Sequence, residues 1–341
     1  MSGVATEQAE YDVVRGGGAG LIDLASQRII QLRGREVVQF LNGMITNDVP
    51  ALADHAWMLA AFPTVQGRLN AFVRVLRLGD AFWLVTDAAT HAWVFQNLHK
   101  FTFAGDFNVH DAAGEVTILS VQGADAARIV ATTVGRAAAD VERGRVALAE
   151  FHESSFPVIR ATHTGEDGFD LFVPAGVAEN LRETLLAGGA RTINADALEV
   201  LRVEAGLALY GADIDETNVV LESGLDEAVS YTKGCYLGQE IIARIHWRGH
   251  VARRVAGIAF AGAPEVRPGD KLKSSDGKDA GRISSTVFSP RLNARIALAL
   301  VKYASLEPGT ELVAVIAAGE EVPARVAALP FVRGGWWGEA G

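Results

Sequence analysis

The sequence has 341 residues, of which 49% are hydrophobic and 21% are charged, and its formal net charge at pH 7 is −10. This length exceeds a single ordinary core, so we expect two or three domains of a globular protein. The negative charge argues against non-specific binding to nucleic acid or anionic membrane, and one cysteine permits neither an internal disulfide nor a four-thiolate iron–sulfur cluster. Without a signal segment or a long apolar run, the sequence predicts a cytoplasmic protein with no intrinsic cluster and no membrane partner.

The N-terminal part combines a predicted mobile arm with a weak repeat. Residues 1–20 end in "RGGGAG", which we interpret as a flexible loop because no strand precedes these glycines. "IQLRGREVVQFL" at 30–41 is similar to "LSVQGADAARIV" at 119–130. Each copy has an apolar strand pattern, a glycine and a helical pattern, so the repeat predicts two related α+β modules.

Strands and helices alternate through the middle of the chain. Residues 69–87 alternate apolar and polar side chains around a Gly-Asp turn and predict a hairpin, and 91–101 predict a helix. Residues 168–175 predict a strand that ends at a proline, and 177–189 predict a helix with two glycines at its C-terminal end. A further helix is expected across 197–209.

After Arg254 the sequence changes to short β-type segments. "VAGIAFAG", "RIALALVKYA" and "ELVAVIAAG" are apolar runs with turn residues between them. The pattern predicts a small antiparallel barrel or sandwich at the C-terminus.

The single cysteine lies in "TKGCYLGQEIIARIHWRG", at 232–249. Gly234 and Gly238 allow a tight turn, and isoleucines four apart predict a helix that starts near Gly238. Cys235 would then lie close to the helix N-terminus and to Lys233, and both favour the thiolate. The alternative is a buried, unreactive cysteine that packs as a small apolar group.

The same stretch is locally basic. Residues 233–254 hold five lysines and arginines and one glutamate, in a chain that is acidic overall. Such a patch favours a particular anionic ligand, and the alternative is a solvated face whose cations pair with nearby carboxylates. His246 and His250 lie four residues apart, but no third ligand is in view, so we expect no metal site.

The octapeptide "KGCYLGQE", followed by "AR" at 243–244, resembles the signature of the YgfZ family. That family comprises folate-binding proteins that support the assembly or maintenance of iron–sulfur enzymes. Further segments, in the expected order, resemble the wider superfamily that includes the glycine-cleavage T-protein, an aminomethyltransferase that uses tetrahydrofolate. The resemblance covers nearly the whole chain, and the segments that carry it are "GLIDLA", "FLNGMITNDV", "TGEDGFDLFVPA", "LRVEAGLALYGADID" and "GRISSTVFSPRLNARIALALV".

The superfamily resemblance implies an α+β fold of three domains in a ring around a folate channel. The first domain would be discontinuous, at 1–57 and 150–250, with a second α+β domain inserted at 58–149. The third, at 251–341, would be an antiparallel β-barrel.

Two departures from the T-protein pattern bear on activity. Asp87 stands where the T-protein has an asparagine, and no carboxylate follows it until Asp106. Leu198 stands where the T-protein has an arginine. Loss of an acid that positions the folate amine, and of a cation for its anionic end, argues against aminomethyl transfer.

The resemblance also implies which residues contact folate. Asp170 matches the acidic residue that hydrogen-bonds the pterin ring, and a carboxylate suits the paired N–H donors of the pterin edge. The alternative is a strand carboxylate that faces solvent. Leu198 would line the pocket wall, and Arg202 and Glu204 would be either ligand contacts or a buried helix ion pair. The remaining candidates follow the cysteine motif: Gly234, Tyr236, Gly238, Gln239, Glu240 and Arg244.

The sequence therefore predicts a cytoplasmic tetrahydrofolate-binding accessory protein for iron–sulfur enzymes. Cys235 would be its essential thiol, beside Lys233 and facing the folate channel. Its partners would be folate and iron–sulfur enzymes or cluster-assembly proteins, with no nucleic acid. The alternatives are a tetrahydrofolate-dependent aminomethyl or one-carbon transferase and an accessory of tRNA modification that uses the basic stretch.

Overall fold

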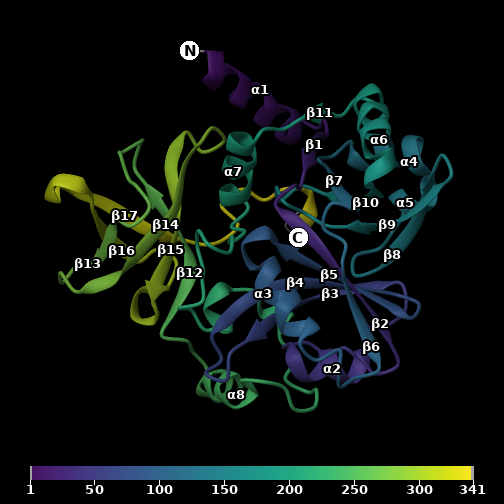
Figure 1. The fold of residues 1–341 in the computed structure, drawn as a ribbon. Coiled ribbons are helices and arrows are strands. Elements are labelled where there is room, and N and C mark those ends of the chain that lie inside the picture. The colour runs from purple at the N-terminus through teal and green to yellow at the C-terminus, as the bar shows by residue number, and fades with distance from the viewer. Residues whose placement is uncertain (1, 339–341) are drawn as a thin grey trace.

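The protein is built around two open β-sheets and one closed β-barrel. We describe it from a computed structural model covering residues 2–338. Figure 1 shows a barrel on one side of the molecule, two sheets on the other, and α7 (Ala195–Glu204) between them. This arrangement confirms the predicted α+β fold with two modules and a C-terminal barrel. No helix among the described residues is long and apolar enough to cross a membrane.

The N-terminal segment is a helix, so the prediction of a mobile arm was wrong. α1 spans Ser2–Arg15, with Tyr11 and Val14 buried and Arg15 paired to Glu204 at 3.0 Å. Apolar residues three apart lie on one helix face and pack against α7 and β1. The mobile arm was predicted from the glycines after Arg15, without regard to this spacing.

One module is a six-stranded sheet. Its β1 and β11 run parallel, and the other neighbouring strands are antiparallel. Helices α4 (Ala126–Val134), α5 (Arg136–Ala139) and α6 (Ala175–Ala187) bury their apolar residues against one face. In spatial order the strands are β11 (Arg191–Thr192), β1 (Gly20–Asp23), β7 (Val116–Gln122), β10 (Gly168–Pro174), β9 (Ser154–Arg160) and β8 (Val146–Phe151).

The other module is a five-stranded antiparallel sheet, covered by α2 (Val37–Met44) and α3 (Ala88–His99). The predicted hairpin is β4 and β5, which turn at Gly79 and Asp80. In spatial order the strands are β3 (Ala56–Pro63), β4 (Leu69–Leu78), β5 (Ala81–Asp87), β2 (Gln27–Gly34) and β6 (Phe107–Asp111).

The two modules share the strand–glycine–helix unit that the repeat predicted. β2 is followed by Gly34 and α2, and β7 is followed by Gly123 and α4. The five-stranded sheet runs from Gln27 to Asp111 because β2 pairs with both β5 and β6. The strands of this sheet thus come from the continuous stretch between β2 and β6, and the domain limits at 57 and 149 stay predictions.

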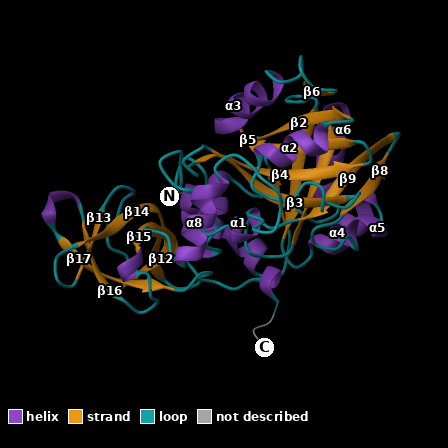
Figure 2. Cartoon of the chain, turned by 90° about the horizontal axis from the view of Figure 1, so that it is seen from below, coloured by secondary structure: helices purple, strands orange, loops and turns teal. Residues whose placement is uncertain are grey.

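A shared core joins the two sheets face to face. Apolar residues of both, such as Leu76 of β4 and Phe172 of β10, belong to one buried cluster, and Trp83 meets Phe172 edge to face. Figure 2 shows the sheets stacked on one side of the molecule, with α2 and α3 on one outer face and α4 and α5 on the other. A polar group at this interface must find partners within the protein.

The C-terminal unit is a closed six-stranded antiparallel barrel, with α8 (Gln239–Arg248) preceding it. Its strand order is β12 (Arg253–Phe260), β15 (Ala294–Lys302), β14 (Asp279–Ser289), β13 (Lys271–Ser274), β16 (Glu311–Val315) and β17 (Glu321–Ala327). Short 3-10 turns occupy Val220–Ser223, Asp226–Ala228, Tyr303–Ser305, Ala317–Gly319 and Gly335–Trp337.

Candidate functional site

Asp170 lies at the interface of the two sheets and is fully buried. Its Oδ1 accepts a hydrogen bond from Ser120 of β7 at 2.7 Å, and its Oδ2 accepts one from Arg74 of β4 at 2.9 Å. The Nε2 of His163, on the loop before β10, lies 3.1 and 3.0 Å from the two oxygens. The structure therefore excludes the solvent-facing alternative for Asp170.

The partners of Asp170 keep its carboxyl group ionised. Burial alone would raise the pKa of Asp170, but the charges and hydrogen bonds of His163, Arg74 and Ser120 outweigh it and hold that pKa well below its usual range. A charged carboxylate at the boundary of two modules is thus stabilised by groups from both.

Two buried donors beside this carboxylate lack partners. The guanidinium of Arg74 lies over the ring of Trp57, 4.9 Å from its centroid. Arg74 Nε and Trp57 Nε1 are both buried and have no hydrogen-bond partner in the described part of the chain. Because buried donors are normally paired, these two mark a place where a ligand or water with acceptor atoms fits.

Asp87 is a second carboxylate of this region. It ends β5 directly before α3. Burial raises the pKa of Asp87, against an opposing attraction from His163. Burial also raises the pKa of Tyr210, with smaller contributions from Glu216, Asp215 and Asp87. From the sequence, Asp87 stands where the T-protein has an asparagine, and the acid that follows it there is missing. The structure shows that Asp87 is a partly buried carboxylate whose charge interacts with His163, a partner of Asp170.

Two α7 residues, Arg202 and Glu204, bind side chains of the barrel, and their contact with folate stays a prediction. Arg202 donates to Asp213 at 2.7 Å and to Ser285 of β14 at 2.9 Å, and it pairs with Glu199. Glu204 accepts from Ser289 of β14 at 2.5 Å.

Arg202 and Glu204 therefore belong to separate polar networks, and the predicted ion pair between them is absent from the described contacts. Leu198 is half-buried and packs against the core that the two sheets share.

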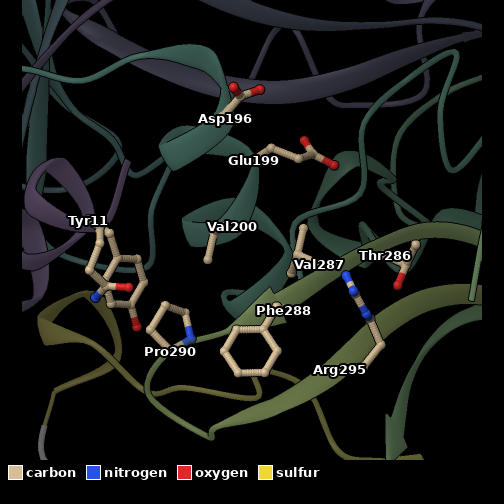
Figure 3. A pocket seen from close by; sticks show the side chains of 10 residues that line it. Tyr11, Asp196, Glu199, Val200, Thr286, Val287, Phe288, Pro290 and Arg295 are labelled. Atoms are coloured by element: carbon tan, nitrogen blue, oxygen red, sulfur yellow. The ribbon is translucent and has the colours of Figure 1, made fainter. Parts of the chain in front are cut away.

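A cavity of about 400 Å³ opens beside α7, where α1, β14 and β15 meet. Figure 3 shows Tyr11 and Pro290 at one side of it and Glu199, Thr286 and Arg295 at the other. Its lining residues include none of the predicted folate contacts.

The Cys235 loop is held by its neighbours in sequence, while the thiol itself is exposed. Lys233 is buried, and its Nζ donates to the carbonyl oxygens of Asn42, Ile45 and Asn47 at 2.7, 2.8 and 2.7 Å. These three bonds use all the donors of an ammonium group. Burial lowers the pKa of Lys233 to about 8, against an opposing attraction from Asp48.

Further contacts fix the loop around the cysteine. The backbone N–H of Leu237 donates to Gly43 O at 3.1 Å, and Tyr236 is buried with the Lys233 ammonium 4.9 Å from its ring centroid. Gly238 has a φ of +78°, and a Cβ there would lie 2.3 Å from Thr64 O. The predicted helix follows as α8, with Gln239 as its first residue. Gly234 has open space where a Cβ would lie.

The basic stretch is largely neutralised. Arg253 pairs with Glu222 at 3.1 Å and Arg254 with Asp226 at 2.6 Å. Exposed Glu240 and Arg244 pair across one turn of α8 at 2.8 Å. Arg248 alone of the five cations has neither an ion pair nor a carbonyl partner among the described contacts. The alternative of a paired, solvated face thus describes this stretch better than an anion site.

Three residues of this region, His163, Arg74 and Trp57, were not predicted. Arg74 and Trp57 come from the other sheet, so only the packing of the two sheets brings Arg74 to Asp170 and Trp57 to Arg74. His163 lies on the loop before β10 in the same module as Asp170. The one available signal was the spacing of His163, seven residues before Asp170, across the turn that opens β10.

Two family descriptions match the chain: "GCVT N-terminal domain" over residues 4–233 and "Glycine cleavage T-protein C-terminal barrel domain" over 253–333. The aminomethyltransferase of Rubrobacter xylanophilus is 32% identical over 330 residues, which cover 96% of this chain and 86% of that protein. The aminomethyltransferase of Nitrosococcus oceani is 31% identical over 345 residues, covering 97% and 88%. The crystal structure of glycine cleavage system aminomethyltransferase T from Bartonella henselae superposes with a TM-score of 0.86 at 25% identity, covering 96% of this chain and 90% of that one.

Proposed function

The chain belongs to the glycine cleavage T-protein family, and from this premise we propose that it binds a tetrahydrofolate with the pterin ring against Asp170. The observation that carries the proposal is the buried, ionised carboxylate beside two unpaired buried donors, Arg74 Nε and Trp57 Nε1. A pterin edge offers paired N–H donors to such a carboxylate, and its ring also has acceptor atoms for donors of this kind.

Each residue of the site has a defined part in this proposal. Asp170 orients the pterin through its two oxygens. Ser120 and Arg74 hold the carboxylate in place through hydrogen bonds, and Arg74 adds a permanent positive charge beside it. The apolar core between the sheets excludes water, which strengthens each of these polar contacts.

A titration with folinic acid, a stable tetrahydrofolate derivative, tests the binding. Tryptophan fluorescence is a suitable signal because Trp57 lies beside Arg74. We expect saturable quenching in the wild-type protein, its loss in Asp170→Asn, and wild-type binding in Asp80→Asn, whose carboxylate is exposed. Absence of binding to the wild-type protein would overturn the proposal.

The first candidate use of the folate is one-carbon transfer from an amine donor. The curated relatives are named aminomethyltransferases, and Asp87 provides a partly buried carboxylate whose pKa burial raises and whose charge interacts with His163. Such a group can hold or accept a proton while the donor amine reacts. The assay is formation of methylene-tetrahydrofolate from an aminomethyl donor. Asp87→Asn should abolish turnover and keep folinic acid binding, whereas no turnover in the wild-type protein would contradict this use.

The second candidate use is support of iron–sulfur enzymes through Cys235. The motif "KGCYLGQE" and the exposure of its thiol on a well-anchored loop favour it. The test is a cluster-dependent enzyme assayed in cells that carry Cys235→Ala in place of the wild-type protein. A normal cluster-enzyme level in these cells would remove the thiol from the function.

The two assays separate the candidates, since Asp87→Asn addresses transfer and Cys235→Ala addresses support. The alternative of an accessory to tRNA modification required unpaired cations in the basic stretch. Arg244, Arg253 and Arg254 are each paired with a carboxylate, so no feature of this stretch supports that alternative. We propose a cytoplasmic location, consistent with a single exposed thiol that would be kept reduced there.

A further inference from the structure

The carboxylate of Asp170 has no acceptor capacity to spare. A carboxylate offers about four lone-pair positions, two on each oxygen. Ser120 and His163 share Oδ1, and Arg74 and His163 share Oδ2. A ligand that brings two N–H donors must therefore displace one of these partners.

His163 is the partner that can leave. Ser120 lies directly opposite Asp170 on the neighbouring strand β7, and Arg74 carries a permanent charge that would stay buried without its carboxylate. His163 comes from a loop, its side chain is 17% exposed, and one ring N–H is divided between both oxygens. Its departure frees one acceptor position on each oxygen, which matches a pair of parallel N–H donors.

The movement needs only the side chain. The backbone N–H of His163 donates to Gln122 Oε1 at 3.0 Å, and Thr164 Oγ1 donates to the same oxygen at 3.3 Å. Gln122 is itself buried and bonded to Ser120 and to Ala161 O. The loop is thus anchored to β7, and rotation of the imidazole ring about its own torsions removes it from Asp170.

We propose that His163 occupies the pterin position on Asp170 and is displaced when folate binds, so that this histidine sets the folate affinity of the site. The inference rests on the proposed folate function. It assigns to His163 a positioning role that neither the motif nor the family descriptions include.

The competition has a pH dependence whose sign follows from charge. An imidazolium pairs with the Asp170 carboxylate more strongly than a neutral imidazole does. A positive charge on His163 therefore favours the state in which the ring occupies Asp170. Folate affinity should therefore be lower in acid than at high pH, and this difference should disappear when the imidazole is removed. The other polar and charged groups around the ring are Arg74 on β4, Ser120 on β7 and Asp87 at the end of β5.

The test compares His163→Ala and His163→Gln with the wild-type protein in folinic acid titrations at several pH values. If the imidazole occupies Asp170 in nine of ten molecules, its removal in His163→Ala strengthens binding about tenfold, by the fraction of competent protein it restores. His163→Gln keeps a non-titrating donor, so its affinity should stay near the wild-type value at high pH and no longer fall in acid. His110→Ala, an exposed histidine paired with Glu115, is the matched control and should behave as wild type.

Each outcome separates this inference from the folate proposal. Binding by the wild-type protein that weakens in His163→Ala would make the histidine a ligand contact and overturn displacement. Persistence of the pH dependence in both His163 variants, with loss in Asp87→Asn, would assign it to Asp87 and overturn the role of His163 in it. Failure of every protein to bind folinic acid would overturn the folate proposal itself. Circular dichroism of each variant checks that it is folded.

Discussion

Asp170 is fully buried and held by side chains from three different segments, whereas Cys235 is exposed and its neighbours serve other parts of the fold. Lys233 lies two residues before Cys235 and donates all three of its hydrogen bonds to carbonyl oxygens in α2 and in the segment that follows it. The first region is a preorganised polar site, and the second is an anchored loop that presents a thiol.

The structure indicates the ligand chemistry of the Asp170 region more directly than that of the Cys235 region. A buried charge must be compensated inside the protein, so the partners of Asp170 also define what can replace them. An exposed thiol needs no compensation, and its chemistry depends on the molecule that reaches it. Substitutions in the two regions should therefore change the unfolding free energy by amounts that differ several fold.

The largest effect is expected for Asp170→Ala. Removal of the carboxylate leaves the Arg74 guanidinium buried without its partner, which typically costs about 3–5 kcal/mol of unfolding free energy. Urea denaturation followed by circular dichroism measures it, with Asp80→Asn as a surface control. An effect no larger than that of the control would show that the network is dispensable for the fold.

The same variant gives a pH test. The pKa of Asp170 is lower in the folded than in the unfolded protein, so its stabilisation is present above the unfolded pKa and lost as pH falls below about 4. The difference in unfolding free energy between wild type and Asp170→Ala should shrink in acid. A constant difference would contradict the ionised carboxylate.

Lys233→Met should have the next largest effect. It removes three charge-assisted bonds from the α2 terminus, and the loss of a bond to a charged group costs about 2 kcal/mol. The pKa of Lys233 falls from 10.5 to about 8 on folding, so the folded protein binds fewer protons between these values. Wild-type stability relative to the variant should thus rise as pH rises from 8 to 10.5.

The alkylation rate of Cys235 in the same variant separates the two roles of Lys233. A rate within about twofold of wild type fits a lysine that holds α2, because carbonyl oxygens occupy all three of its donors. A fall of about tenfold would restore the predicted role in thiolate activation.

The sequence alone was sufficient to predict those elements whose hydrophobic pattern lies within one short segment. The hairpin at β4 and β5, the strand–glycine–helix repeat and the short barrel strands each have a periodicity that one segment displays alone. The strand order of the five-stranded sheet was harder to predict, because β2 pairs with β5 and β6, which both lie far along the chain.

The candidate site shows the same limit. Asp170 could be named from its segment, but Arg74 is 96 residues away and meets it only through the packing of the sheets. Arg202 and Glu204 lie two apart on α7, a spacing at which helical side chains do not face each other. They therefore found separate partners on the barrel, which no local pattern could predict.

Arg244→Ala should have a small effect. Arg244 and Glu240 are 70% and 83% exposed, and a pair of this kind at i, i+4 contributes about 0.3–0.5 kcal/mol. Thermal unfolding at low and high salt measures it, and the difference from wild type should vanish at high salt. A salt-independent loss of folate binding would instead support the predicted ligand contact of Arg244.

Cys235→Ser should have the smallest effect on the molecule itself. The side chain is exposed, so the change in unfolding free energy should stay within about 0.5 kcal/mol. Folinic acid affinity should equal that of the wild-type protein, because the contacts that build the Asp170 site come from β4, β7 and the loop before β10. A weaker folinic acid complex would join the two regions into one site. If support of cluster enzymes in cells is lost while stability and folate affinity are kept, the thiol acts on a second molecule.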